Sequence, residues 1–259
     1  MELSIYQIDA FASEIFKGNP AAVCPLEEWL SDDEMQSIAC ENNLSETALF
    51  VPTNNGFHIR WFSPTSEVAL CGHATLASSF VIFNILNYDN DKIEFESKSG
   101  ILTVTKNADS FTLDFPAQPP QKCETPIEIT NAFEAIPTDC LKSEDYIVVF
   151  DDKKDIKNAD PDFEQLKKLV LRGVIITAKS NNYDFVARGF FPTLGINEDP
   201  VTGSAYTQLA PYWSSKLGKN KFNVKQLSLR GGELVCELKG DRVFITGKAI
   251  KYMEGQITI

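Results

Sequence analysis

Short segments of alternating apolar and polar residues predict β-strands along the first part of the chain. They are residues 3–12, 47–51 and 57–62. Ser31 is followed by acidic residues up to Glu34, which is typical of a helix start and predicts a helix running towards Asn43. Residues 74–86 are apolar or small on nearly every side, and a helix of this kind is normally buried. Residues 205–217 occupy the same place in the second half.

The pattern of elements occurs twice. The peptide F-x-x-R-x-F-x-P-T begins at Phe57 and again at Phe185, an offset of 128 in a chain of 259 residues. A turn of small residues follows each copy, Gly72-His73-Ala74 in the first half and Gly203-Ser204-Ala205 in the second. Predicted strands at 92–96, 101–105 and 110–115 recur as 224–229, 233–238 and 242–246. Matches in the same order indicate an internal duplication.

The duplication predicts an α+β fold of two similar lobes, each a curved and mainly antiparallel sheet wrapped round a central helix. We place the lobes at residues 1–116 and 127–249, and we interpret the proline-rich residues 117–126 as a linker. The last strand, at about 250–259, is expected to rejoin the first lobe. Two similar halves create one cleft between them, and we expect the active site there.

Composition narrows the class of protein. The net charge of −12 argues against a nucleic-acid partner, because phosphate binding needs clustered lysine and arginine. No apolar run approaches the roughly 20 residues that cross a bilayer, and the first residues lack the features of a signal peptide. The six cysteines are scattered and there are only two histidines, so we expect no metal site. A cytoplasmic enzyme or binding protein remains.

The two glycine turns are candidates for anion binding. Each is expected just before a buried helix, where the first amides have no intrahelical partner and the helix dipole is positive. Gly72 and Gly203 would let a carboxylate approach the backbone closely. The alternative is that both are only tight turns, and the duplication favours binding.

Two residues are candidates for acid–base chemistry. His73 occupies the position that Ser204 has in the second half, so the duplication does not require histidine for packing. Histidine titrates nearest neutrality, which favours an acid–base role over a structural one. Glu46 stands at the edge of an apolar strand, where burial would raise its pKa and make it usable as a base or acid. The alternative for Glu46 is a solvated carboxylate.

Two further residues flank the turns. Asp199 precedes the second turn and can be a proton-transfer group or a turn residue before proline. Cys71 precedes the first turn, where its pKa could be lowered, or it is a small buried apolar residue.

The chain resembles the phenazine-biosynthesis PhzF-like family, within the diaminopimelate epimerase superfamily, from end to end. Four ordered motifs carry the resemblance. They are Asp9-Ala10-Phe11 with Gly18-Asn19-Pro20, Asn43-Leu44-Ser45-Glu46-Thr47, Cys71-Gly72-His73-Ala74-Thr75, and Glu198-Asp199-Pro200-Val201-Thr202-Gly203-Ser204-Ala205. The resemblance implies a two-lobed fold with the active site between the lobes, no cofactor, and a homodimer.

The resemblance also implies roles for residues. Glu46 matches the main proton-transfer residue of the family, and His73 and Asp199 match its assisting polar residues. The turns at Gly72 and Gly203-Ser204 match the groups that bind the substrate carboxylate, with Asn19 and Cys71 beside them. Tyr206 is a departure, because many relatives have histidine there, and it could alter substrate choice.

We therefore expect a cofactor-independent isomerase that moves a proton on a small carboxylate-bearing substrate. One alternative is an epimerase or racemase of an amino or hydroxy acid, although two-thiol racemisation is disfavoured because no cysteine precedes Gly203. Another alternative is a non-catalytic protein that binds a small molecule. The sequence does not identify the substrate.

Overall fold

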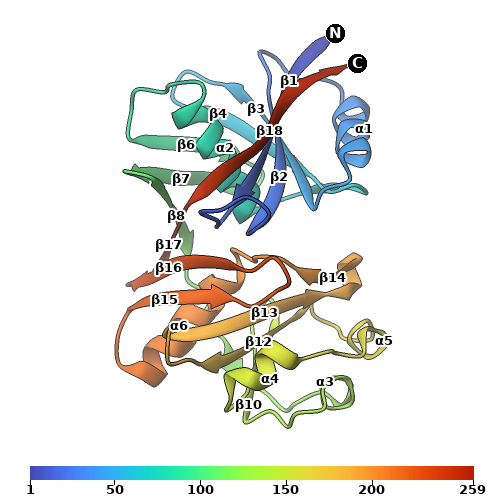
Figure 1. Cartoon of the computed structure of the whole chain (residues 1–259), viewed down its shortest axis with the longest axis vertical. Helices are drawn as coiled ribbons and strands as arrows, with labels where there is room; N and C mark the ends of the chain where they lie inside the picture. Colours follow the sequence, from blue (N-terminus) through green and yellow to red (C-terminus); the bar gives the residue numbers. More distant parts are fainter. The chain divides into compact units, whose positions relative to one another are not determined.

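The computed structural model describes residues 1–259, and the chain divides into two compact units. Unit 1 comprises Met1–Asp114 and Thr246–Ile259, and unit 2 comprises Phe115–Ile245. Each unit combines a curved, mainly antiparallel sheet with one long buried helix, so the predicted α+β class is confirmed (Figure 1). Every helix is too short or too polar to cross a membrane.

Unit 1 is built around the helix α2. In it β1 pairs antiparallel with both β2 and β18, and β2 runs parallel to β3. Its elements are β1 (Glu2–Ala10), β2 (Asn19–Pro25), α1 (Asp32–Asn42), β3 (Glu46–Pro52), β4 (Phe57–Phe62), β5 (Glu67–Val68), α2 (Gly72–Asn84), β6 (Lys92–Ser97), β7 (Gly100–Asn107), β8 (Ser110–Pro116) and β18 (Ala249–Thr258).

Unit 2 is built around the helix α6. In it β10 pairs antiparallel with β9 and β11, and β11 runs parallel to β12. Its elements are β9 (Gln121–Lys122), α3 (Ile127–Ala132), β10 (Asp139–Lys142), β11 (Tyr146–Val149), α4 (Lys153–Asn158), α5 (Phe163–Leu166), β12 (Val174–Lys179), β13 (Phe185–Phe191), a 3₁₀ turn (Pro192–Leu194), β14 (Ile196–Asp199), α6 (Ala205–Leu217), β15 (Lys221–Gln226), β16 (Gly232–Lys239) and β17 (Arg242–Gly247).

The strand pairings follow one pattern in both units. In unit 1, β3 is antiparallel to β4, β4 is parallel to β6, and β6 is antiparallel to β7. In unit 2, β12 is antiparallel to β13, β13 is parallel to β15, and β15 is antiparallel to β16. Along the chain, the long buried helix follows β5 and precedes β6 in unit 1, and it follows β14 and precedes β15 in unit 2. The sequence repeat therefore corresponds to a repeated supersecondary structure.

The arginine of the repeated peptide has a structural role in each unit. Arg60 forms two hydrogen bonds with the carboxylate of Glu67, at 2.8 Å each. Arg188 forms two with Glu198, at 2.6 and 3.0 Å. The guanidinium groups also lie over the rings of Phe62 and Phe190, at 5.1 and 5.0 Å from the ring centroids. Bidentate pairing and stacking are specific to arginine, which explains why it recurs.

Helix α2 is buried on nearly all sides, as its composition predicts, and it packs against β1, β2 and β3. Its three hydroxyl residues are buried but satisfied, because each donates a hydrogen bond to the carbonyl four residues earlier. These residues are Thr75, Ser78 and Ser79. A polar residue can therefore occupy this core without an unpaired group.

The proline-rich segment predicted as a linker is attached to α6. Pro211 lies inside α6 and has no amide hydrogen, so the carbonyl of Thr207 receives no bond from it. The Thr207 carbonyl instead accepts a hydrogen bond from the amide of Gln118 at 3.0 Å. The hydroxyl of Thr207 also donates to Gln118 Oε1. Residues 117–126 fall within unit 2, and they include the short strand β9.

Two differences between the expected and the observed element boundaries concern turns. The strand expected at 224–229 is β15, Lys221–Gln226, because the chain then forms a turn in which Gly231 N–H donates to Ser228 Oγ and Gly231 has a φ of +64°. The helix expected at 74–86 begins at Gly72 and ends at Asn84. The first turn of α2 therefore includes the residues predicted to precede it.

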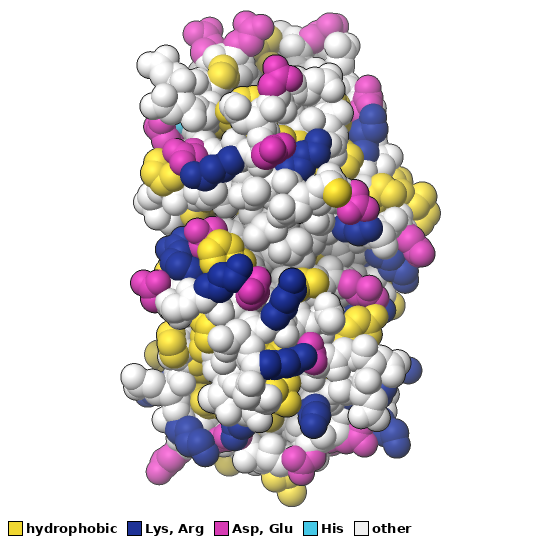
Figure 2. Space-filling view, turned by 90° about the vertical axis from the view of Figure 1, so that its left-hand side faces the viewer, with side chains coloured by type: hydrophobic (Ala, Val, Ile, Leu, Met, Phe, Trp, Pro, Cys, Tyr) yellow, Lys and Arg dark blue, Asp and Glu magenta, His cyan; other side chains and the backbone are white.

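Charges on the surface are mixed. On the face in Figure 2, the side chains of lysine and arginine lie among those of aspartate and glutamate, without a field of one sign. Several charged side chains of the molecule form pairs, for example Lys92 with Glu94 at 2.7 Å and Lys225 with Glu233 at 2.9 Å. Such exposed pairs contribute little to stability.

Candidate functional site

The beginning of α2 places two candidate residues. Cys71 is extended, with a φ of −144°, and serves as the N-cap, although its side chain makes no capping hydrogen bond. Gly72 starts the helix, and His73 follows in its first turn. Cys71 and His73 are both buried. The first amides of the helix have no intrahelical partner, so this end of α2 has a positive electrostatic potential.

The other two candidate residues, Asn19 and Glu46, lie at the beginnings of strands. Asn19 is the first residue of β2 and Glu46 is the first of β3, and these strands are parallel neighbours in which Ala21 lies opposite Glu46. The preceding Gly18 has a φ of +66°, and a Cβ added there would lie 2.1 Å from the carbonyl oxygen of Ala10. Glycine is therefore required for the close approach that leads into Asn19.

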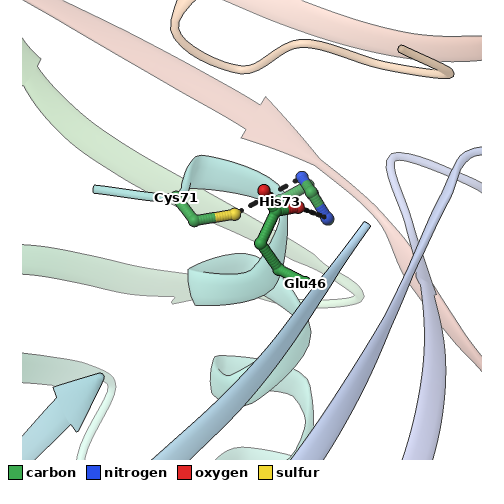
Figure 3. A group of neighbouring side chains, drawn as sticks. All are labelled: Glu46, Cys71 and His73. Carbon is green, nitrogen blue, oxygen red and sulfur yellow. Dashed lines mark hydrogen bonds and ion pairs between the residues drawn. The ribbon is translucent and has the colours of Figure 1, made fainter. Parts of the chain in front are cut away.

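These four side chains meet at the imidazole of His73. Asn19 Nδ2 lies 3.2 Å from His73 Nδ1, and Cys71 Sγ lies 3.5 Å from the same nitrogen. Glu46 Oε2 lies 3.2 Å from the other ring nitrogen, Nε2. Figure 3 shows the thiol of Cys71 and the carboxylate of Glu46 directed toward the ring. We call Asn19, Glu46, Cys71 and His73 the imidazole cluster.

The imidazole of His73 is neutral near physiological pH. Burial disfavours its charged form and lowers its pKa to about 3. The amide nitrogen of Asn19 can only donate, so Nδ1 accepts and the ring proton resides on Nε2, which faces Glu46. Nε2 and Glu46 Oε2 are close enough for a hydrogen bond, but the N–H group is not aligned with the oxygen. The proton on Nε2 therefore does not form a hydrogen bond with Glu46.

The cluster offers one nitrogen, one sulfur and one oxygen as possible metal ligands, all within 4.8 Å of one another. A metal ion held by all three would need a single ring nitrogen directed between Cys71 and Glu46. Instead the two residues contact opposite nitrogens of His73. This arrangement suits proton transfer through the imidazole better than metal coordination.

In unit 2 the remaining candidates lie at the end of β14 and the beginning of α6. Asp199 is buried, and its Oδ2 accepts a hydrogen bond from Thr202 Oγ1 at 2.7 Å. Gln226 fixes this turn, because its amide donates to the carbonyl of Asp199 and its Oε1 accepts from the amide of Thr202. The buried hydroxyl of Tyr206 donates to the same Oε1 at 3.2 Å. Tyr206 thus supports the turn.

The first turn of α6 is tight. The amides of Ala205, Tyr206 and Thr207 donate to the carbonyls three residues earlier, at 3.2 Å each. The amides without an intrahelical partner are therefore those of Gly203 and Ser204, which are the two residues predicted to bind a carboxylate. Ser204 is half-buried, so it can be reached by a ligand.

Sequence reasoning missed the groups that support these turns. Gln226 is one, and a buried network of Asp145, Arg172 and Gln208 beside Ser204 is another. None of them belongs to a repeated peptide or a glycine turn. The available signal was weak: an arginine just before an apolar strand, and an aspartate just before another.

The structure brings together all the predicted residues of unit 1, namely Asn19, Glu46, Cys71, Gly72 and His73. In unit 2, Asp199, Gly203 and Ser204 lie along a single turn. Their roles in catalysis and binding remain predictions.

Comparison with known proteins gives a consistent result. A sequence model described as phenazine biosynthesis-like protein matches residues 8–255. An uncharacterized isomerase of Pseudomonas aeruginosa is 50% identical over 257 residues, which are 99% of each chain. The crystal structure of a phenazine biosynthesis protein of the PhzF family from Enterococcus faecalis is 45% identical, with a TM-score of 0.98 and complete coverage of both chains.

More distant structures share the fold. A hydroxyproline epimerase from Agrobacterium vitis has a TM-score of 0.66 at 10% identity, covering 99% of this chain and 92% of its own. At this identity the likeness concerns the fold alone. The matches over nearly the whole sequence show that this chain belongs to the phenazine biosynthesis-like family and is an isomerase.

Proposed function

We propose that this isomerase moves a proton on a small carboxylate-bearing substrate without a cofactor, with Glu46 as the main acid–base group. The observation that carries the proposal is the contact of Glu46 Oε2 with the buried, neutral imidazole of His73. A neutral imidazole does not hold the neighbouring carboxylate in its ionised form. The carboxylate therefore keeps its capacity to accept a proton.

The proposed reaction balances without an oxidant or a reductant. Glu46 accepts a proton from a substrate carbon, the electrons of the broken C–H bond form a new double bond, and the original double bond shifts along the frame. Glu46 then returns the proton to a different carbon. His73 carries a donor at Nε2 and an acceptor at Nδ1, so it can exchange a proton with a heteroatom of the substrate.

The carboxylate of the substrate is assigned to the amides at the two helix starts. Gly203 and Ser204 in unit 2 have amides without intrahelical partners, and Gly72 and His73 in unit 1 begin α2. Amides of this kind bind anions at the positive end of a helix dipole. Asp199 is proposed to assist by exchanging a proton with the substrate.

Epimerisation at one carbon is a second candidate, and one contact favours it. Cys71 Sγ lies 3.5 Å from His73 Nδ1, which can accept the proton of the thiol, and both residues lie at the positive start of α2. A thiolate at Cys71 could remove a proton from a stereocentre and a second group could return it. The matching position before Gly203 is Thr202, which cannot serve as a second thiol.

The test is incubation of the protein in D₂O with a panel of small amino, hydroxy and unsaturated carboxylic acids, followed by proton NMR. Double-bond migration with deuterium uptake supports the proposal. Deuterium uptake with loss of optical rotation and no bond shift supports epimerisation instead. Binding of panel members without any exchange would show a binding protein and contradict both.

A further inference from the structure

A buried ionic network in unit 2 converges on Ser204. Arg172 donates two hydrogen bonds to the carboxylate of Asp145, at 2.9 and 2.7 Å, and a third to Ser204 Oγ at 3.0 Å. Asp145 is completely buried, whereas the side chain of Arg172 is 28% exposed. Gln208, one turn after Ser204 on α6, donates to Asp145 Oδ2 at 2.7 Å and accepts from its amide at 3.1 Å.

The direction of the hydrogen bond to Ser204 has a consequence. A guanidinium has only donors, so Ser204 Oγ must be the acceptor. The proton of this hydroxyl then points away from Arg172 and is available to another acceptor. Ser204 is half-buried, with its backbone amide at the start of α6. Its hydroxyl is thus oriented as a donor beside amides that are donors too.

The network has a structural counterpart in unit 1. Thr47 lies opposite Phe62, and Val174 lies opposite Phe190, the matching phenylalanine of the repeat. Thr47 and Val174 therefore occupy equivalent positions, and the residue before each is Glu46 or Gly173. Arg172 directly precedes Gly173, so it lies one position before the counterpart of Glu46, the proposed base.

The same correspondence applies to the other members. Ala22 lies opposite Thr47 and Tyr146 lies opposite Val174, so Asp145 corresponds to Ala21, two residues after Asn19. Ser204 corresponds to His73 through the glycine turns. Ser204 thus takes the place of His73, whereas Arg172 lies one residue from the place of Glu46 and Asp145 lies two residues from the place of Asn19. The duplication has placed an acid–base group in one unit and a cationic group in the other.

We infer that Arg172 and Asp145 are positioning residues that fix the hydroxyl of Ser204 as a donor to the carboxylate of the substrate. Arg172 does so through its bond to Ser204 Oγ, and Asp145 and Gln208 hold the guanidinium in place. The inference rests on the proposed function, because it assigns the carboxylate to the start of α6.

Charges around Arg172 agree with a supporting role. Burial opposes its charge, but Asp145, Glu144 and Asp199 outweigh burial and raise its pKa. Arg172 is therefore permanently charged and is neutralised chiefly by Asp145. Its ring contact with Phe191, at 5.5 Å, further restricts the guanidinium.

The test uses the full-length protein and acetate as the probe, with the amide resonances of Gly203, Ser204 and Ala205 followed by NMR and sodium chloride as the ionic-strength control. We expect saturable shifts in the unsubstituted protein. Ser204→Ala should weaken acetate binding about tenfold, as expected for loss of one hydrogen bond to a charged group. Removing Arg172 alone would leave Asp145 buried and unpaired, so the variant used is Arg172→Met with Asp145→Asn, which removes both charges together.

The double variant should also weaken acetate binding about tenfold, but should add almost nothing in the Ser204→Ala background, because Arg172 acts through that hydroxyl. The matched control is Arg60→Met with Glu67→Gln, a bidentate pair in unit 1, which should leave the affinity unchanged. Unchanged binding in the Arg172 variant, or equal weakening in both backgrounds, would overturn the inference alone. No shift in the unsubstituted protein, or none of the expected weakening in Ser204→Ala, would overturn both it and the carboxylate assignment.

Discussion

At the scale of single residues, Glu46 is the group on which the proposed chemistry depends. Glutamine at this position preserves the shape of the side chain and removes the proton acceptor. We expect Glu46→Gln to lower the rate of deuterium exchange roughly 10²–10⁴-fold with a small effect on substrate binding. Glu41→Gln, which alters an exposed glutamate of α1, is the control. Exchange at the original rate in Glu46→Gln would show that the base lies elsewhere.

His73 should make the stability of the protein depend on pH. Unfolded, this imidazole has a pKa near 6.5, whereas burial lowers the pKa to about 3 in the folded chain. Between these values the unfolded state binds a proton that the folded state does not. The free energy of unfolding should therefore fall as pH drops below about 6.5, by up to about 1.4 kcal/mol per pH unit from this one residue.

Denaturant unfolding of the protein and of His73→Gln, at several pH values from 4 to 8, provides the measurement. Between pH 4 and 6, the free energy of unfolding of His73→Gln should change less steeply with pH, by the amount that corresponds to about one proton. Above pH 7 the slopes should coincide, because the imidazole is neutral in both states there. Equal slopes at acid pH would mean that His73 is protonated in the folded protein.

Residue types and motifs could predict the candidates of the imidazole cluster, but not the direction of their contacts. The sequence shows His73 close to Cys71 and places Glu46 at the edge of an apolar strand, but it does not predict that a strand begins at Asn19. Which ring nitrogen faces which partner depends on the register of β2 against β3. Arg172 and Asp145 escaped prediction because their importance arises from a contact with Ser204 across three separate elements.

At the scale of elements, α1 begins with a complete capping box. The amide of Glu34 donates to Ser31 Oγ, and Glu34 Oε2 accepts from the amide of Ser31. Ser31→Ala should lower the free energy of unfolding by about 1 kcal/mol. Ser37→Ala, inside the same helix, should be neutral or slightly stabilising, because alanine is the better helix former. Thermal or denaturant unfolding measures the stability of both variants. Equal changes in the free energy of unfolding for Ser31→Ala and Ser37→Ala would show that the cap does not contribute.

The elements that hydrophobic periodicity identified lie within a few residues of their predicted positions, because the alternation in β4 and the uninterrupted apolar character of α2 are strong signals. The periodicity did not identify β2 or the elements from β9 to β14. It failed where a turn or a tertiary contact competes. The Gln118 amide bonds to a carbonyl that Pro211 leaves free, so a proline-rich segment became attached to α6. No local pattern in the sequence contains that contact.

At the scale of the whole molecule, unit 1 is assembled from two distant parts of the chain. Strand β18 covers one edge of β1 along nine residue pairs, from Glu2 opposite Thr258 to Ala10 opposite Ala249. Deleting residues 249–259 should destabilise unit 1 and expose β1 as an edge that promotes aggregation. The core strands of unit 2 contain none of these residues.

Hydrogen exchange measured by mass spectrometry distinguishes the two units in the deleted chain. Protection should fall in β1 and β2 and persist in β12 and β13. Tyr252→Ser, at an exposed position of β18, keeps the strand and should leave both patterns unchanged. Equal loss of protection in the two units would show that they unfold as a single cooperative body.

The duplication could be predicted at this scale because the repeated peptides stand in the same order in both halves. The sequence predicts that the last strand rejoins the first lobe, but it does not predict that this strand pairs with β1, since β18 is separated from β1 by all of unit 2 and carries mostly exposed side chains. Pairing of such distant strands is specified by the edge that β1 offers and not by a local signal.

The discontinuity of unit 1 has a consequence for the order in which the protein acquires its structure on the ribosome. Unit 2 is continuous from Phe115 to Ile245, so all its strands have been synthesised before any residue of β18 emerges. During that interval β1 has β2 as a neighbour and an uncovered second edge. The segment that bears Glu46 and His73 thus completes its sheet after the segment that bears Ser204. For a nascent chain, the period between the two events is the one in which binding of β1 by a chaperone would matter most.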